Sequence, residues 1–183
     1  MNNLESKEIS YTSIEVASPD DAEAIAHIQK ETWLATYPNE EYGITEDDIK
    51  SKEFTSEKRI LGWKERFENP SKDIQTFVVK EGNDVVGFCT LSKGEIENIV
   101  RALYLLPSAQ GKGLGKELLM KGLQWLGSEK DISLHVAKYN SGAIDFYSKC
   151  GFEIDETDVS GSGTQLSSGA VIPVIRMIKK NIK

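Results

Sequence analysis

The chain has 183 residues, 39% of them hydrophobic and 28% charged, with a formal net charge of −7. This length suits one domain with a substantial core, and the acidic balance argues against a general nucleic-acid binder, which carries a basic face. No apolar run approaches the roughly 20 residues that a membrane span needs, and the first residues show no signal or transit pattern. Cys89 and Cys150 lack metal-ligand spacing. We therefore expect no metal site, no membrane partner and a cytoplasmic protein with reduced thiols.

Helix and strand signals follow one another in a regular order along the chain. We expect a polar lead-in over residues 1–12 and a single domain over residues 13–183. In the first half, apolar periodicity and capping residues predict a strand over 14–17, a helix over 18–37, a short helix opening at 45 and a third helix over 56–67. A hairpin of two strands, 75–80 and 84–91, is expected to follow. In the second half they predict a strand over 96–106 with a helix ending at 127, and a strand over 133–136 with a helix over 140–149. Two further strands, 151–154 and 171–177, are expected on either side of a flexible loop over 160–169.

This order of elements predicts an α/β domain: a mixed, mostly antiparallel sheet flanked by helices on both faces. Pro173 lies within the last predicted strand. Because proline has no N–H to donate, we expect it at an edge or a bulge.

The stretch from Arg101 to Lys121 combines a strand, a proline-marked exit, a glycine loop and the start of a helix. Glycines at such a junction expose backbone N–H groups, and the helix start adds the positive end of its dipole. The stretch therefore predicts a phosphate-bearing ligand. A P-loop and a Rossmann fingerprint both need a glycine where this chain has Lys116. The remaining pattern, Q-x-x-G-x-G at Gln110, Gly113 and Gly115, resembles the pyrophosphate loop of the GNAT (GCN5-related) N-acetyltransferases; a plain strand-to-helix turn is the alternative.

A second segment, from Asn140 to Phe152, matches the pattern N-x-x-A-x-x-F-Y-x-K-x-G-F of that family at every specified position. It follows the glycine loop after one helix and one strand, as it does in the family. The resemblance covers roughly residues 75–155. It implies the single-domain GNAT fold, acetyl-CoA as cofactor, and direct transfer of an acetyl group to a primary amine in a ternary complex. A non-catalytic acyl-CoA-binding or sensing module is the alternative, and a nucleotide-phosphate enzyme is a third.

The resemblance also implies how the cofactor is held. The strand before the loop pairs with the pantetheine arm through its backbone, and the N–H of Leu105 is the expected donor to the thioester carbonyl. Asn140 is expected to bond the same arm, although a plain N-cap is the alternative. Lys112 and Lys116 meet phosphate charge or remain solvated. The expected cofactor contacts are Leu103, Tyr104, Leu105, Gln110, Gly111, Lys112, Gly113, Leu114, Gly115, Lys116, Asn140, Ala143, Phe146, Tyr147 and Lys149. Phe146 and Phe152 are also expected to pack in the core.

Two residues are candidates for the chemistry. A phenol such as that of Tyr147 has a pKa of about 10, so it is a poor base at neutral pH but a usable proton donor to a departing thiolate. In the family, the tyrosine at this position is the general acid; a packing role is the alternative. Many relatives carry a glutamate where this chain has Ile99. Glu97 shares its strand face and is the candidate base, directly or through water; a solvated carboxylate is the alternative.

The acceptor pocket of the family is built from the first two helices and the late hairpin loop. Here that segment, residues 31–48, combines aromatic rings with carboxylates, and Glu31, Trp33 and Tyr37 are the expected contacts. This combination suits a cationic amine such as a polyamine. Acidic residues early in helices are also ordinary dipole partners, so small-molecule and peptide amines both remain open. Homodimers are common in the family, but no residue establishes one here.

Overall fold

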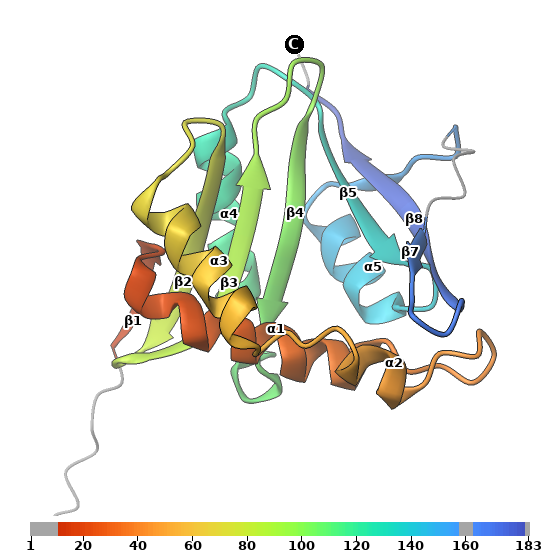
Figure 1. Cartoon of the computed structure of the whole chain (residues 1–183). Helices are drawn as coiled ribbons and strands as arrows, with labels where there is room; N and C mark the ends of the chain where they lie inside the picture. Colours follow the sequence, from red (N-terminus) through yellow and green to blue (C-terminus); the bar gives the residue numbers. More distant parts are fainter. Residues whose placement is uncertain (1–10, 158–162, 182–183) are drawn as a thin grey trace, which may run out of the picture.

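A central mixed sheet organises the computed structural model, which describes residues 11–157 and 163–181. Its strand order is β1-β2-β3-β4-β5-β8-β6, with β7 beside β8 (Figure 1). The strands are β1 (Thr12–Val16), β2 (Ile74–Glu81), β3 (Asp84–Ser92), β4 (Asn98–Leu105), β5 (Ile132–Ala137), β6 (Glu153–Ile154), β7 (Gly163–Gln165) and β8 (Val171–Lys179). All pairs are antiparallel except β4 with β5, which is parallel.

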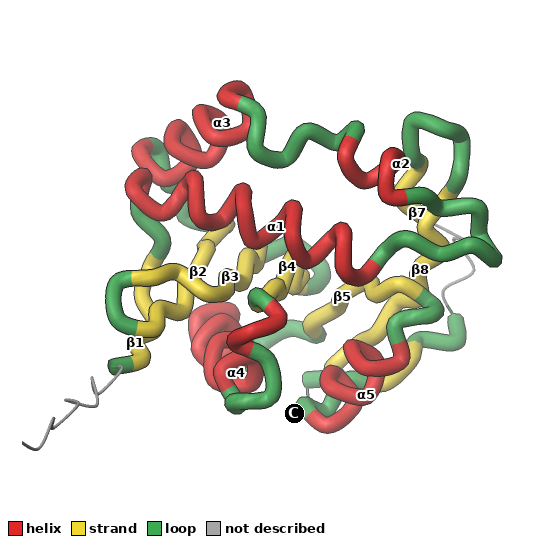
Figure 2. The backbone as a smooth tube through the Cα atoms, turned by 90° about the horizontal axis from the view of Figure 1, so that it is seen from below, coloured by secondary structure: helices red, strands yellow, loops and turns green. Residues whose placement is uncertain are grey.

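Helices cover both faces of this sheet, as Figure 2 shows in the view from below. The first three helices lie on one face and the last two on the other: α1 (Ala22–Thr36), α2 (Glu46–Lys50) and α3 (Glu57–Glu68), against α4 (Leu114–Leu126) and α5 (Ser141–Lys149). The predicted fold, a mixed and mostly antiparallel sheet between two helical layers, is confirmed.

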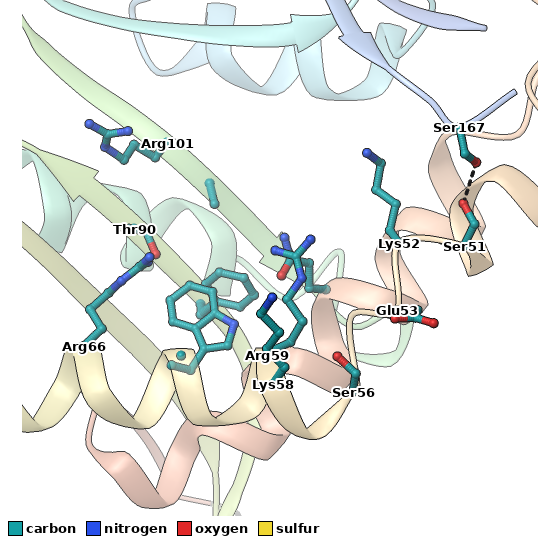
Figure 3. Close-up of a pocket in the computed structure, with 15 residues that line it drawn as sticks. Ser51, Lys52, Glu53, Ser56, Lys58, Arg59, Arg66, Thr90, Arg101 and Ser167 are labelled. Carbon is teal, nitrogen blue, oxygen red and sulfur yellow. Dashed lines mark hydrogen bonds between the residues drawn. The ribbon is translucent and has the colours of Figure 1, made fainter. Parts of the chain in front are cut away.

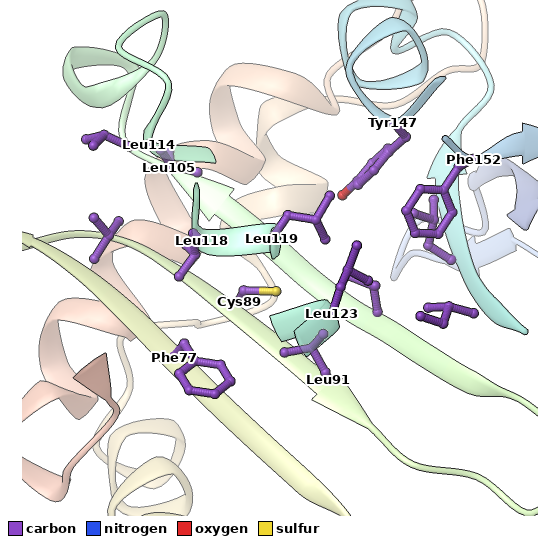
Figure 4. Packing of buried hydrophobic residues seen from close by; sticks show 14 of the residues in the cluster. Phe77, Cys89, Leu91, Leu105, Leu114, Leu118, Leu119, Leu123, Tyr147 and Phe152 are labelled. Carbon is purple, nitrogen blue, oxygen red and sulfur yellow. The ribbon is translucent and has the colours of Figure 1, made fainter. Parts of the chain in front are cut away.

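The larger core lies under α4 and α5 (Figure 4). Leu118, Leu119 and Leu123 recur at helical spacing and are buried against the sheet, each contributing roughly 1.5–3 kcal/mol of burial free energy. A Cβ on Gly122 would lie 2.7 Å from the side chain of Leu91 on β3. The glycine therefore lets α4 pack closely against β3.

Both expected helix starts are capped as the sequence indicates, but the first helix begins later than expected. Ser18 and Asp21 form the expected capping box, but it opens a short 3-10 turn over Pro19–Asp21, and α1 begins only at Ala22. The turn forms because Asp21 donates its N–H to Ser18 three residues back rather than four. Thr45 caps α2 with a second capping box.

Three predicted boundaries near the chain ends are wrong. Thr12, assigned to the polar lead-in, is the first residue of β1, and residues 1–10 lie outside the described residues. The predicted strand over 151–154 is reduced to β6, because Gly151 has a left-handed φ of 87° that turns the chain. The predicted flexible loop contains β7, a polar three-residue strand without apolar alternation; its residues 160–162 are not described. Pro173 lies where β8 leaves β5 and pairs with β7.

Candidate active site

β4 and β5 are paired over only three residues each, Asn98–Val100 with Ile132–Leu134. Beyond Val100 the strands diverge, as the region between β4 and β5 in Figure 1 shows. In the part of the chain that the structure describes, the remaining edge of β4 on this side has no strand partner. This divergence leaves peptide groups of β4 available to an extended ligand.

The direction of the β4 peptide groups follows from one hydrogen bond. Leu106 donates its N–H to the carbonyl of Val86 on β3. Because this direction alternates along a strand, the N–H and C=O groups of Leu103 and Leu105 point to the open edge. Those of Tyr104 point to β3. Tyr104 therefore offers the cleft its side chain rather than its backbone.

Two irregularities position the end of β4. The pairing of β3 with β4 shifts at Arg101, an extra residue opposite Thr90 and Leu91; such bulges bend strands and are frequent beside active sites. Opposite the strand end, a Cβ on Gly87 would lie 2.8 Å from Cγ of Leu105 and 2.9 Å from the carbonyl oxygen of Tyr104. A side chain at Gly87 would therefore push the open edge out of place.

The glycine loop supplies a run of free N–H groups. In residues 111–115 no backbone N–H bonds to a described residue, and these groups lead into the positive end of α4. Gly111 and Gly113 have φ values of 75° and 87°, and no atom lies within 4 Å of where their Cβ atoms would be. The loop is thus an open cradle for an anion.

The lysines and the glutamine of this loop have other partners in the structure. The N–H of Lys116, an expected cofactor contact, bonds the carbonyl of Gly113 at 3.0 Å and is already used. Lys112 forms an ion pair with Glu81 at 2.8 Å; because this pair is exposed, it is weak. Gln110 donates to the carbonyl of Leu105 at 3.1 Å and ties the loop to the strand end.

Helix α5 closes the other side of the cleft. Asn140 accepts the N–H of Ala143 at 3.1 Å and so caps the helix. Ala143 and Phe146 pack against the core beside α4, and the ring of Phe146 lies within 4 Å of where a Cβ on Gly115 would be. Lys149 is exposed in the last turn. Phe152, expected in the core, is buried.

Tyr147 projects from α5 toward α4 and the sheet (Figure 4). Burial raises its pKa above the ordinary value of a phenol, and the neighbouring Cys89 and Tyr104 add to this effect. Every buried polar side-chain atom of the described chain has a hydrogen-bond partner, and no described residue bonds the Tyr147 hydroxyl. Its oxygen is therefore not completely enclosed, although only 8% of the residue is exposed. The raised pKa keeps this phenol, the candidate donor, protonated.

An aromatic group links the cleft to α1. Trp33 donates its indole N–H to the hydroxyl of Tyr104 at 3.1 Å and packs on Tyr37 with ring centroids 4.5 Å apart. Burial raises the pKa of Tyr37, and Tyr104 and Tyr147 raise it further. The structure thus brings Trp33 and Tyr37, two of the three expected acceptor contacts, close to Tyr147, the candidate acid.

Glu97 lies away from this group. It precedes β4, accepts a hydrogen bond from Ser133 at 2.9 Å and forms an ion pair with Arg176 on β8, which also pairs with Asp155. The carboxylate is thus held at the end where β4 and β5 are still paired. This position argues against a base. The ion pair with Arg176 also differs from the solvated carboxylate given above as the alternative.

A pocket of about 870 Å³ lies on the other face of the sheet (Figure 3). It is lined by α1, the segment from α2 into α3, the middle of β3 and β4, and Ser167 of the β7–β8 hairpin. Ser51 and Ser167 close one wall through a hydrogen bond of 2.8 Å. It shares α1 and the β7–β8 hairpin with the acceptor pocket that the resemblance implies. None of residues 31–48 lines it, so the expected contacts Trp33 and Tyr37 lie outside it.

The charge of this pocket is opposite to the expected one. Its charged lining residues are one carboxylate, Glu53, and five cations: Lys52, Lys58, Arg59, Arg66 and Arg101. We call these residues and their surroundings the basic pocket. The expected acidic contact, Glu31, is not among its lining residues and lies on α1 beside Lys30, 4.0 Å away.

Sequence reasoning missed Gly87 and the cations of the basic pocket. A glycine inside a strand is a signal of close backbone approach, so Gly87 could have been found. The lysines and arginines carry no local signal, because charged residues on helix surfaces are ordinarily solvated. Only the fold gathers them.

The model of the acetyltransferase (GNAT) family matches residues 22–152. The chain therefore belongs to this family of acetyltransferases, whose cofactor is acetyl-CoA. The crystal structure of PaiA N-acetyltransferase from Thermoplasma acidophilum in complex with coenzyme A superposes with a TM-score of 0.73 and 25% identity, over 93% of this chain and 99% of that chain. The ribosomal-protein-S18-alanine N-acetyltransferase from Escherichia coli, with a TM-score of 0.64 and 18% identity over 94% of this chain and 96% of that chain, shares the fold.

Curated relatives differ in how much of their length is matched. A spermidine N(1)-acetyltransferase from Thermoplasma acidophilum is 29% identical over 155 residues, 81% of this chain and 93% of that protein. A mycothiol acetyltransferase from Amycolatopsis mediterranei is 35% identical over 94 residues, 45% of this chain and 31% of that protein. The chain thus spans less than a third of the mycothiol enzyme.

The residues present fit coenzyme A. The open edge of β4 offers N–H and C=O groups to an extended, amide-containing arm, and the free N–H groups of residues 111–115 suit its pyrophosphate. Among the described residues, no cluster of histidine, cysteine and carboxylates could hold a metal ion, and no helix is both long and apolar enough to span a membrane.

Proposed function

We propose that this protein transfers the acetyl group of acetyl-CoA to a primary amine. The observation that carries the proposal is the arrangement of the cleft: an open β4 edge leads into free N–H groups, with the unbonded hydroxyl of Tyr147 on the facing helix. The spermidine and mycothiol acetyltransferases among the relatives support acetyl transfer.

The chain's own groups divide the work as follows. When bound, acetyl-CoA supplies an acetyl group on a thioester sulfur. Leu105 directs its N–H to the open edge and donates it to the thioester oxygen, where negative charge develops. Tyr147 donates its phenolic proton to the departing sulfur. The amine loses its proton to water, because Glu97 is bound to Arg176.

Direct attack by the amine is supported by the state of the two cysteines. Cys89 is fully buried in the core, where burial raises its pKa well above the ordinary value of a thiol. Burial also raises the pKa of Cys150. Neither thiol is a ready thiolate, which is the form needed to carry an acetyl group in a two-step reaction.

The test is release of free thiol from acetyl-CoA with a panel of amines, for the wild type and Tyr147→Phe. We expect amine-dependent release that is strongly reduced in the variant. Tight binding of acetyl-CoA without turnover on any amine would instead identify a binding or sensing module.

A further inference from the structure

In the part of the chain that the structure describes, none of the five cations of the basic pocket forms an ion pair. The chain as a whole has a net charge of −7, so carboxylates to neutralise them are not scarce. The pocket keeps its positive charge although the surrounding protein is acidic.

Aromatic rings anchor two of these cations. The guanidinium of Arg66 lies 4.7 Å from the ring centroid of Trp63 on the same helix, and the ammonium of Lys52 lies 5.7 Å from that of Trp33. A cation held against an aromatic face needs no carboxylate to fix its position. Figure 3 shows the labelled lysines and arginines gathered around one open space from α3, the segment before it and β4.

The basic pocket lies next to Tyr104 along β4. Ala102, in its wall, precedes Tyr104 by two residues on β4, which is roughly 7 Å along a strand and on the same face. Lys52 also touches Trp33, whose indole bonds the Tyr104 hydroxyl. An acceptor with its amine at the cleft would therefore extend its other end among the cations.

We propose that the acceptor is a small-molecule amine that carries at least two negative charges, as carboxylate or phosphate groups, bound in the basic pocket. This inference rests on the acetyl transfer proposed above. Three of the cations are arginines, Arg59, Arg66 and Arg101, whose planar guanidinium matches carboxylate and phosphate with paired hydrogen bonds. The volume of about 870 Å³ lies in the range of small-molecule sites.

The same charges disfavour a polyamine, the substrate named for one relative. Several ammonium groups would have to enter a pocket that offers one carboxylate, Glu53, among five cations. Like charges at these separations repel, and a pocket lined by one sign concentrates ligands of the opposite sign. A polyamine is thus the outcome that would contradict the proposal.

The test compares pairs of amines in which one member carries additional anionic groups. Glucosamine 6-phosphate is compared with glucosamine for phosphate, and the dipeptide Asp-Glu with Asn-Gln for carboxylates, with spermidine as the cation. We expect kcat/KM to be at least about tenfold higher for the anionic member of one pair or both, and the preferred pair names the group. The preference should weaken with added salt. Equal rates within both pairs, or faster acetylation of spermidine, would overturn it.

Two exposed arginines on different elements, Arg59 on α3 and Arg101 on β4, make the test specific. Arg59→Gln and Arg101→Gln should each reduce the preference for the anionic member at least about threefold. Lys121→Gln, which removes an exposed cation of α4 outside the pocket, is the matched control and should keep the preference. An unchanged preference in both arginine variants would place the selectivity elsewhere and contradict the proposal.

Failure of this inference can be told from failure of acetyl transfer. If amines are acetylated with the wrong charge preference, only the acceptor class is wrong. If no amine is acetylated, the transfer proposal fails, and calorimetry of glucosamine 6-phosphate and Asp-Glu with the protein bound to coenzyme A still tests the pocket. Binding of either ligand that is lost in Arg101→Gln but kept in Lys121→Gln supports an anion site. No binding of either contradicts it.

Discussion

The cofactor cleft and the basic pocket lie close together on β4 but are built from different parts of the chain. The cleft uses main-chain groups, namely those at the open edge of β4 and the N–H groups of residues 111–115, which are close together in the sequence. The pocket uses charged side chains from α3, the segment before it and the β4 bulge. One site therefore depends on backbone path, and the other depends on side-chain identity.

This difference bears on what each site can specify. Backbone N–H groups recognise a phosphate whatever the surrounding side chains are, so a cleft of this kind serves one cofactor across a family. Side chains such as Arg59 and Arg101 change without altering the fold, so the pocket can differ between relatives that share the cleft. The spermidine enzyme and this chain can thus be similar in fold and differ in acceptor.

The largest expected effect tests the chemistry at the cleft. Tyr147→Phe removes the proton donor and should lower kcat about 100-fold, with little change in the KM for acetyl-CoA, because the ring still packs in the core. Burial raises the pKa of Tyr147, so the donor form persists as pH rises, and the wild type should show no loss of kcat from this group up to about pH 10.

The control for this change is Tyr11→Phe, which removes a phenol hydroxyl at a position with 78% exposure. It should leave kcat unchanged. A Tyr147→Phe variant with wild-type kcat would show that the cleft binds the cofactor without supplying the acid.

The second prediction separates backbone geometry from side-chain identity. Gly113→Ala places a Cβ on a residue with φ of 87° and in the open space of the anion cradle. We expect a KM for acetyl-CoA about tenfold higher and a loss of roughly 1 kcal/mol of folding stability from strain. The preference between charged and uncharged acceptors should not change, because the basic pocket is untouched.

Gly82→Ala provides the matched control, since Gly82 has a similar φ of 65° and equal space around it but lies in the β2–β3 turn. It should show the same loss of stability with an unchanged KM. A rise in KM in both variants would point to general destabilisation.

The cleft could be predicted from the sequence because its determinants are contiguous. Gln110, Gly113 and Gly115 follow one strand directly, and Asn140 to Phe152 form one helix and turn. The two capping boxes were also visible as local patterns. Boundaries were less secure where short polar strands form only by pairing, as β7 does with β8.

The charge of the acceptor side could not be predicted, because it depends on which distant side chains meet. The sequence of residues 31–48 places carboxylates early in α2 beside aromatic rings, a combination that suits a cationic acceptor. In the structure Glu46 and Asp47 pair with Lys50, and Asp48 bonds Thr45. These carboxylates have partners nearby in the sequence, whereas Arg59 and Arg101, over 40 residues apart in the sequence, line the same pocket.

A third, smaller effect tests the position of Glu97 outside the cleft. Glu97→Gln removes a charged partner of Arg176 and weakens the hydrogen bond from Ser133. We expect a loss of about 1–2 kcal/mol of folding stability, measured by urea denaturation, with kcat changed less than about threefold. A large fall in kcat, with a shift of the acid limb of its pH profile, would restore Glu97 as the base.

The smallest predicted effect concerns the wall of the basic pocket. Hydrogen bonds from Ser168 on the β7–β8 hairpin and from Thr45 lower the pKa of Asp48 to about 2. Because the folded-state pKa lies below the ordinary value, the ionised carboxylate stabilises the fold above about pH 4, and this contribution is lost as pH falls toward 2. Asp48→Asn should therefore be slightly less stable than the wild type at pH 7, and the difference should shrink as the pH falls through this window.

The matched control is Asp47→Asn, which removes the neighbouring carboxylate at an exposed position. Its folding stability should differ little from that of the wild type, both at pH 7 and at low pH. Because Asp48 holds α2 to the hairpin that carries Ser167, its loss should raise the KM for the acceptor slightly and leave the KM for acetyl-CoA unchanged. If both KM values rose together, the two sites would share one structural support, and the contrast between a backbone-built cleft and a side-chain-built pocket would not hold.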